Sequence, residues 1–415
     1  MNHTPITGNV IVGQSGGPTA VINASLAGVY KTAKQLGADK VYGMRYGVQG
    51  LLEERYIDMS VVLKNEISVE LLKQSPSAFL GSCRYKLPEP VHGDPIFEKI
   101  FAILQKLDVK YFFYIGGNDS MDTIRKLHDY GAQAGSEIRF IGIPKTIDND
   151  LMETDHTPGY GSAAKYVATM VKELIVDARV YDMRSITVVE IMGRNAGWLT
   201  ASSALSRAKD CPGPDFIYLP ELPFSLEKVR ESVEERMKTQ KSVFIAMSEG
   251  VKDVSGAMYS DVVGNTTAVD AFGHKLLSGA GQHASNYLGR TLGCKVRSIE
   301  LSSVQRCGAH MVSLVDVSEA FQVGGAAVKA AAEGESGKMV ILKRVSEDPY
   351  ICVTDLADVH NIANIEKKVP LEWIAPSGHG VTEDFIRYAQ PLIQSEVSHM
   401  MINGLPGFLT MPEGM

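Results

Sequence analysis

The chain has 415 residues, enough for two or three hydrophobic cores, and its 45% hydrophobic and 21% charged residues are those of an ordinary globular protein. A formal net charge of −7 argues against non-specific binding to nucleic acid or to an anionic membrane surface. With no apolar run of the ~18 residues that span a membrane, no secretion-signal pattern and five scattered cysteines, the sequence predicts a reduced cytoplasmic protein.

Nearly continuous apolar runs, each followed by a turn and often by a helical pattern, recur along the chain. In chain order, the clearest runs are 9–12, 110–115, 140–143, 185–191 and 242–247. Continuous rather than alternating apolar runs are typical of strands that are covered on both faces. Helices between such strands imply right-handed crossovers, so we expect an α/β fold with mostly parallel sheets.

A long polar connection, from residue 144 to residue 161, precedes an amphipathic segment at 162–180. That segment predicts a helix with Ser162 as its N-cap. We expect a change of domain in this connection. Residues 1–160 and roughly 308–355 would then form one domain, and residues 161–307 and roughly 356–415 a second one.

Two of the turns are glycine-rich. Residues 13–18, GQSGGP, match neither a P-loop nor GxGxxG, but their glycines let backbone amides approach a phosphate. A plain strand-to-helix turn explains them equally well. In GGNDS at 116–120, Asn118, Asp119 and Ser120 stand at a helix start. Oxygens of this turn are suited to Mg²⁺, directly or through its waters, although a carboxylate there is also a favourable helix cap.

The segment PKTIDND at 144–150 follows a buried strand and holds more polar groups than a turn requires. In open α/β sheets, ligands bind beyond the carboxyl ends of the strands. Asp148 is suited to accept a proton from a substrate hydroxyl, and Thr146 to orient that substrate. Lys145 is suited to neutralise a transferring phosphoryl group. The plain alternative is a turn with a solvated lysine.

Several arginines also stand at strand or turn ends. Arg194 lies in MGRNAG, Arg84 in FLGSCR, and Arg297 and Arg306 flank SIELSSVQ. Arginine suits bidentate recognition of phosphate, and surface ion pairs are the alternative. Glu249 in SEG is a candidate acceptor for sugar hydroxyls, or simply the end of a strand. The histidines show no metal-ligand spacing, and we interpret His156 and His379 as polar loop residues.

Together these motifs resemble the phosphofructokinase family, and within it the pyrophosphate-dependent branch. The matching segments follow the family's order and are 15–17, 79–84, 116–120, 144–150, 192–197, 248–250 and 296–306. The resemblance implies two doubly wound, Rossmann-like domains with the active site in the cleft between them. It also implies Mg²⁺ as cofactor and a homodimer or homotetramer.

The resemblance further implies a role for each matching residue. Asp148 is similar to the family's general base, which deprotonates the 1-hydroxyl of fructose 6-phosphate; Lys145, Asp119 and Arg194 would act with it. The sugar phosphate would contact Thr146, Asp148, Asp150, Met192, Gly193, Arg194, Glu249, Ser303, Arg306 and Arg297, one of the last two arginines coming from a neighbouring subunit. The donor would contact Gly16, Gly17, Arg84, Asp119, Ser120 and Lys145, and Mg²⁺ would contact Asn118 and Asp119.

Two positions favour pyrophosphate as the donor. ATP-using relatives have glycine in place of Asp119 and of Lys145, which leaves room for the nucleotide's α-phosphate. Here Asp119 would repel that phosphate, whereas Lys145 adds a positive charge that pyrophosphate can use. The expected reaction gives fructose 1,6-bisphosphate and phosphate, and it runs in both directions because the free-energy drop is small.

Two departures from the family leave alternatives open. Asn118 lacks the usual carboxylate, and Ser303 stands where bacterial ATP-dependent relatives have a sugar-contacting histidine. One alternative is therefore a non-catalytic regulatory subunit that binds sugar phosphate, although Asp148 and Lys145 argue against it. A second is an ATP-dependent phosphofructokinase. A nicotinamide dehydrogenase lacks support because GxGxxG is missing.

Overall fold

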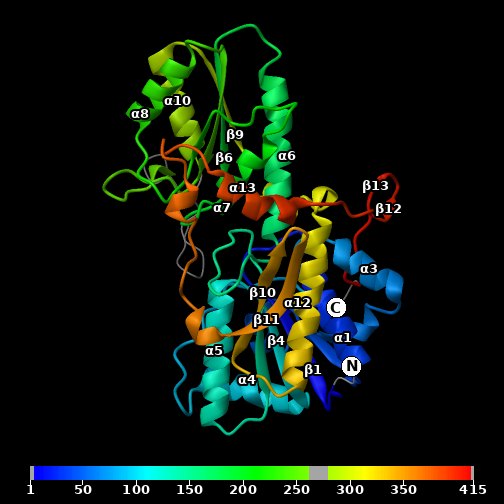
Figure 1. Cartoon of the computed structure of the whole chain (residues 1–415). Coiled ribbons are helices and arrows are strands. Elements are labelled where there is room, and N and C mark those ends of the chain that lie inside the picture. Colours follow the sequence, from blue (N-terminus) through cyan, green and yellow to red (C-terminus); the bar gives the residue numbers. More distant parts are fainter. Residues whose placement is uncertain (1–3, 261–278, 413–415) are drawn as a thin grey trace.

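The computed structural model describes residues 4–260 and 279–412. In this part of the chain, two lobes form around separate parallel-rich sheets, one above the other in Figure 1. The two lobes are joined by the connection before helix α6, by helix α12 and by the C-terminal extension. The predicted α/β fold with two mostly parallel sheets is confirmed.

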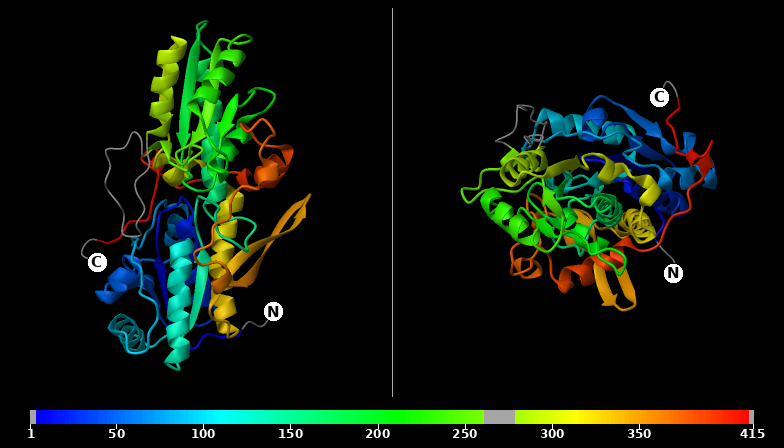
Figure 2. Two further views of the ribbon diagram at one scale, coloured as in Figure 1. Left: turned by 90° about the vertical axis from the view of Figure 1, so that its left-hand side faces the viewer. Right: turned by 90° about the horizontal axis from the view of Figure 1, so that it is seen from above.

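The sheet of the first lobe has seven strands in the described residues, in the order β11-β10-β5-β4-β1-β2-β3. They are β1 (Asn9–Gln14), β2 (Val41–Met44), β3 (Tyr56–Asp58), β4 (Val109–Gly116), β5 (Arg139–Pro144), β10 (Lys338–Glu347) and β11 (Tyr350–Asp358). Only the edge pairs β2–β3 and β10–β11 are antiparallel among these strands. The β10–β11 ribbon extends away from the lobe (Figure 2).

The register brings the ends of three strands level. Gln14 of β1 pairs with Ile115 of β4, and Gly116 of β4 pairs with Pro144 of β5. The turns that follow β1, β4 and β5 therefore start at one edge of the sheet. That edge faces the second lobe (Figure 1).

Helices cover both faces of this sheet. They are α1 (Ile22–Gln35), α2 (Gly47–Leu52), α3 (Glu66–Gln74), α4 (Pro95–Lys106), α5 (Asn118–Gln133) and α12 (Leu314–Ala332). Helices α1 and α12 pack on one face and α4 and α5 on the other. The close contact of α1 with α12 needs glycine, because a Cβ on Gly28 would clash with the carbonyl oxygen of Phe321.

The second lobe has an all-parallel sheet of four described strands in the order β7-β8-β6-β9. Its strands are β6 (Ser185–Ile191), β7 (Phe216–Tyr218), β8 (Ser242–Ser248) and β9 (Lys295–Glu300). Its helices are α6 (Tyr160–Ala178), α7 (Trp198–Ser202), α8 (Leu226–Arg236), α10 (Ala280–Leu292) and α11 (Val304–Cys307). Two apolar cores flank this sheet, one under α6 and α7 and the other under α8 and α10.

The extension beyond β11 contacts both lobes. It contains α13 (Glu383–Ala389) and the hairpin β12 (Met401–Ile402) to β13 (Leu405–Pro406). Val359 lies in the core of the first lobe, whereas Tyr388 of α13 packs on Trp198 of the second lobe. The chain then returns to the first lobe, where Gln74 donates a hydrogen bond of 2.7 Å to the carbonyl oxygen of Gly407.

The remaining described helices are short 3₁₀ turns: η1 (Met59–Val61), η2 (Ser203–Ser206), η3 (Ala309–Met311), η4 (Val359–Asn361), η5 (Leu371–Trp373) and η6 (Gln390–Ile393). No helix within residues 4–260 and 279–412 is both long and apolar enough to cross a membrane.

The predicted strands are confirmed, because each predicted apolar run coincides with one of β1, β4, β5, β6 and β8. The predicted N-cap of the helix after the long connection is wrong. Helix α6 begins at Tyr160, and the backbone amides of Gly159 and Ser162 donate instead to the carboxylate of Asp316 on α12, at 2.9 and 2.8 Å. A carboxylate from a distant helix thus accepts the hydrogen bonds of backbone N–H groups at the start of α6, which have no partner within that helix.

Candidate active site

A cavity of about 560 Å³ lies where the turns of the two lobes meet. The first lobe supplies the turns after β1, β4 and β5, and the second lobe supplies the turns after β6 and β8 together with α11. Nine charged side chains line it: Arg84, Lys145, Arg194, Arg306, Asp119, Asp148, Asp150, Glu249 and Glu366. The cavity is therefore suited to a small, highly charged ligand rather than to an apolar one.

The SGG turn, residues 15–17, is held by the loop that contains Arg84. Gly16 has a φ of 75°, which favours glycine, and its amide donates to the carbonyl oxygen of Cys83 over 3.1 Å. Ser82 Oγ donates to the carbonyl oxygen of Gly16 over 2.6 Å. These bonds place Arg84 beside the turn at the cavity wall.

Lys145 is buried at the base of the same wall. Its side chain is 3% exposed, and Nζ donates to the carbonyl oxygen of Gly17 over 2.6 Å. Burial lowers the pKa of Lys145 to about 8, against the attraction of Asp148 and Asp150. The lysine thus occupies space between the SGG turn and the loop after β5, and it is mainly charged at neutral pH.

The loop after β5 presents the two predicted carboxylates. Thr146 Oγ1 accepts a hydrogen bond from the backbone amide of Asp148 over 3.1 Å. Burial raises the pKa of Asp148, and Lys145 and Arg194 oppose that rise. Burial together with the charge of Asp148 raises the pKa of Asp150 to about 7. A raised pKa makes a carboxylate a stronger general base, as long as it is ionised at the working pH.

Helix α5 points its N-terminus into the cavity. Asn118 Nδ2 donates to the carbonyl oxygen of Ile365 over 2.9 Å, which fixes the amide plane. Among the described residues, Asn118 Oδ1 is buried and has no hydrogen-bond partner. Asp119 and Ser120 line the cavity in the same turn. An unpartnered amide oxygen beside a carboxylate is a donor set that fits a hard divalent cation such as Mg²⁺.

The second lobe contributes the turn of Met192 to Arg194. The amide of Gly193, which has a φ of 140°, donates to Glu249 Oε1 over 3.3 Å. A Cβ on Gly250 would clash with the carbonyl oxygen of Arg194, so the two turns require glycine to approach each other. Burial raises the pKa of Glu249 to about 8.

Three guanidinium groups gather at this cavity. Burial lowers the pKa of Arg84, and the nearby charges of Arg306 and Arg194 lower it further. A Cβ on Gly17 would lie 3.7 Å from Arg306 Nη1, so Arg306 reaches from α11 to the SGG turn. The charges of Asp119 and Asp148 oppose the lowering of the Arg84 pKa. Because guanidinium groups suit bidentate recognition of phosphate, the cluster is a candidate phosphate site.

Most residues that the sequence predicted as a site thus line one cavity, and Gly193 borders it through its backbone. Arg297 and Ser303 do not line it. Arg297 lies on β9, where its half-exposed guanidinium forms a 2.8 Å ion pair with Asp177 of α6. Ser303 is exposed at the start of α11.

Sequence reasoning missed three polar residues of the cavity wall: Asn195, Asn364 and Glu366. Asn195 Nδ2 donates to Glu366 Oε1 over 2.9 Å, and the amide of Lys367 donates to the carbonyl oxygen of Asp150 over 2.8 Å. The segment around residue 366 therefore runs along the loop after β5 and reaches the second lobe. It carries no periodic or glycine-rich pattern, so the sequence offered no signal for it.

The arrangement combines a half-buried carboxylate, a buried ammonium group and an arginine cluster in one cavity. These are the parts needed to deprotonate a hydroxyl and to stabilise a phosphoryl group during its transfer.

Comparison with known proteins agrees with this chemistry. The family model described as Phosphofructokinase matches residues 9–331. A pyrophosphate–fructose 6-phosphate 1-phosphotransferase of Halomonas elongata is 37% identical over 96% of this chain and 94% of the relative, and one of Xanthomonas campestris is 38% identical over 97% and 96%. The crystal structure of a pyrophosphate-dependent phosphofructokinase from Marinobacter aquaeolei superposes with a TM-score of 0.86 at 34% identity, over 97% of this chain and 96% of that one. The chain therefore belongs to the phosphofructokinase family.

Proposed function

We propose that this protein transfers a phosphoryl group from pyrophosphate to the 1-hydroxyl of fructose 6-phosphate and yields fructose 1,6-bisphosphate and phosphate. A new bond forms between O1 of the sugar and phosphorus, the phosphoanhydride bond breaks, and the proton of the hydroxyl goes to Asp148. The observation that carries this proposal is that buried Lys145 and half-buried Asp148 line one cavity together with three arginines. Full-length relatives named for this reaction support it.

In this mechanism the sugar phosphate binds between the second lobe and the loop after β5 of the first lobe. Its contacts are Thr146, Asp148 and Asp150 at the loop after β5, and Met192, Gly193, Arg194, Glu249 and Arg306 across the cavity. Glu249 accepts hydrogen bonds from sugar hydroxyls, and Arg306 pairs with the 6-phosphate. Asp148 and Asp150 together hold a proton more tightly than either carboxylate alone, because two nearby carboxylates resist double ionisation.

The first lobe binds the donor. The turn of Gly16 and Gly17, with Ser120 and Arg84, surrounds the pyrophosphate, and Lys145 neutralises charge that develops on the transferring group. Asp119 repels the α-phosphate of a nucleotide, so ATP is excluded. A regulatory subunit without catalytic activity is disfavoured, because the proposed base and the buried lysine are both present in the cavity.

We further propose Mg²⁺ as the cofactor, held near Asn118 and Asp119. Bound there, the ion would neutralise phosphate charge and orient the donor. The unpartnered Oδ1 of Asn118 supports this placement. Because Asn118 brings no negative charge, Asp119 supplies the local carboxylate.

We also propose a homodimer or homotetramer in which Arg297 acts in the site of a neighbouring subunit. The position of Arg297 outside its own cavity supports this. The lobes would serve as a donor domain (residues 1–160 and roughly 308–355) and a sugar domain (161–307 and roughly 356–415), with the extension contacting both.

The experiment is to incubate the purified chain with fructose 6-phosphate, Mg²⁺ and either pyrophosphate or ATP, and to follow the phosphorus species by ³¹P NMR. We expect fructose 1,6-bisphosphate and phosphate with pyrophosphate, and little product with ATP. Turnover with ATP alone would contradict the proposed donor, and absence of turnover with either donor would contradict the proposed reaction.

A further inference from the structure

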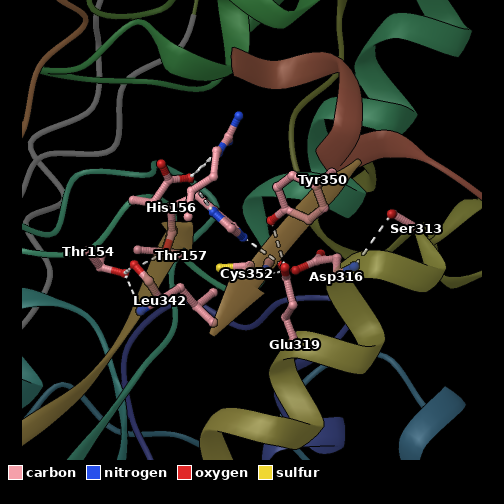
Figure 3. A network of polar contacts seen from close by, with 12 residues as sticks. Thr154, His156, Thr157, Ser313, Asp316, Glu319, Leu342, Tyr350 and Cys352 are labelled. Atoms are coloured by element: carbon pink, nitrogen blue, oxygen red, sulfur yellow. Dashed lines mark hydrogen bonds and ion pairs between the residues drawn. The ribbon is translucent and has the colours of Figure 1, made fainter. Parts of the chain in front are cut away.

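A buried histidine lies between two carboxylates next to the proposed base loop. His156 is 1% exposed; its Nδ1 lies 2.8 Å from Asp155 Oδ1 and its Nε2 lies 2.6 Å from Glu319 Oε2 (Figure 3). Burial alone would lower the pKa of His156, but the charges of Glu319 and Asp155 outweigh it and raise that pKa to about 9. His156 is therefore an imidazolium at neutral pH, with each N–H donated to a carboxylate.

Both carboxylates are in turn fixed by the first lobe. Glu319 belongs to α12, and Tyr350 of β11 donates to its Oε1 over 2.7 Å. Arg344 of β10 donates to Asp155 Oδ1 over 2.9 Å, and the amide of Asp155 donates to the carbonyl oxygen of Leu342 over 2.9 Å. The imidazolium thus joins the long connection before α6 to α12 and the β10–β11 ribbon.

From His156 the contacts lead directly to the base loop. The next residue, Thr157, donates from Oγ1 to the carbonyl oxygen of Thr146 over 2.8 Å and from its amide to Asn149 Oδ1 over 3.0 Å. Asn149 stands between the two proposed active-site carboxylates, is fully buried and has a φ of 55°. An asparagine in this left-handed conformation needs such partners to hold it.

A second path reaches the same asparagine from the extension. Tyr388 of α13 accepts a hydrogen bond from Asn149 Nδ2 over 2.7 Å and donates to the carbonyl oxygen of Asp155 over 2.8 Å. The side chain of Asn149 is therefore held at both ends by residues that depend on the Asp155–His156 segment. A shift of that segment would move the loop that carries Asp148.

His156, Glu319 and Cys352 lie close enough to suggest a metal site, since their ligand atoms are within 4.8 Å of one another. The chemistry argues against one. Both ring nitrogens of His156 already face carboxylate oxygens, Nδ1 at 2.8 Å from Asp155 and Nε2 at 2.6 Å from Glu319. Both oxygens of Glu319 already accept hydrogen bonds.

We propose that His156 is a positioning residue for the phosphoryl transfer: as a cation between Asp155 and Glu319, it holds Thr157 and Asn149, and through them the loop of Asp148, in the reactive arrangement. This inference rests on the proposed function. It assigns His156 no contact with substrate.

The test compares His156→Gln with His360→Gln. His360 is a matched control, because it also lies between two carboxylates, with Nδ1 2.8 Å from Asp358 and Nε2 3.1 Å from Asp129, but it is half exposed and has no contact with the base loop in the described residues. We expect His156→Gln to lower kcat by roughly ten- to a hundredfold, because small misplacements of reacting groups are costly, and to change the KM for pyrophosphate less than about twofold. His360→Gln should leave both unchanged.

The pH dependence separates positioning from simple folding. Other charged or titratable groups around His156 are Asp155, Asp316, Glu319, Arg344, Tyr350, Cys352, Lys367 and Tyr388. The ratio of kcat between the native chain and His156→Gln should approach one as the pH rises through about 9, where native His156 becomes neutral. Lys145, Asp150 and Glu249 titrate in both proteins and cancel in the ratio.

Glu319→Gln keeps the shape of the partner and provides a second variant if His156→Gln does not fold. Glu319→Gln should also lower kcat. The ratio of kcat between Glu319→Gln and His156→Gln should depend less on pH than the ratio between the native chain and His156→Gln. An unchanged kcat in a variant whose only change is a lower Tm would overturn the inference, as would a ratio that does not vary with pH. Failure of the native chain to use pyrophosphate would instead contradict the proposed function.

Discussion

Lys145 Nζ donates a 2.6 Å hydrogen bond to the carbonyl oxygen of Gly17, so the ammonium group lies against the glycine turn that is proposed to bind the donor. If Gly16 carried a Cβ, that atom would be 3.4 Å from the same Nζ. The lysine thus occupies the space at the inner end of the donor site. A compact donor can use the charge, whereas a longer one meets an obstacle.

The first prediction concerns donor choice. Replacing both Asp119 and Lys145 by glycine should open space and remove the repulsive carboxylate, so activity with ATP should rise while activity with pyrophosphate falls by ~10²-fold or more. A coupled assay with each donor measures kcat/KM. Loss of pyrophosphate activity without any gain with ATP would show that the exclusion argument is wrong.

The second prediction concerns alkaline pH. Burial lowers the pKa of Lys145 to about 8, so its charge is present below that pH and is lost above it. We expect kcat/KM for pyrophosphate to fall as the pH rises above 8. Lys145→Met should be low at every pH and should lack this fall.

Glu249 serves as the control for that profile, because burial raises its pKa to about 8 and it titrates in the same range. Glu249→Gln should weaken sugar binding but retain the alkaline fall in kcat/KM for pyrophosphate. If the alkaline fall persists in Lys145→Met and disappears in Glu249→Gln, the titrating group is Glu249 and the assignment to Lys145 is wrong.

The third prediction concerns the metal. Asn118→Asp should add a charged oxygen ligand and tighten Mn²⁺ binding, measured by EPR titration without turnover. It loses the bond to Ile365, at a cost of about 1 kcal/mol in stability. Asn195→Asp, which adds the same charge on the second-lobe wall of the cavity, should tighten binding much less. Equal effects of the two variants would argue against a site at Asn118.

The fourth prediction concerns the subunits. If Arg297 acts in a neighbouring site, then Arg297→Ala and Arg306→Ala chains should both be weak alone and should complement each other when mixed. Each mixed dimer would hold one intact site, so about a quarter of the native activity should return at equal mixing. A mixture no more active than its components would place both arginines in the same site or in none.

Much of the fold could be predicted from the sequence, because continuous apolar runs ending in glycine or polar turns identify buried parallel strands. The carboxyl ends of such strands meet at one edge, so Lys145, Asp148 and Asp119 could be expected near each other before any coordinates were known. The pairing of Gly116 with Pro144 confirms that the two turns start level.

Other contacts could not be predicted, because they join residues that are far apart in the chain and follow no local pattern. Glu366 and Asn364 reach the cavity from an irregular extension. Asp316 on α12, rather than Ser162, caps the N-terminus of α6 by accepting hydrogen bonds from its first backbone amides. The sequence indicates only a polar loop residue at His156, and its partner Glu319 on α12, 163 residues later, reveals that the imidazole is buried between two carboxylates.

The most direct test of the central claim is the kcat of Asp148→Asn with pyrophosphate and fructose 6-phosphate. Asparagine keeps the size of the side chain and removes its ability to accept the hydroxyl proton. We predict a loss of about 10²–10⁴-fold in kcat, with the KM for both substrates changed only slightly. A rate close to that of the native chain would contradict the role of Asp148 as the base.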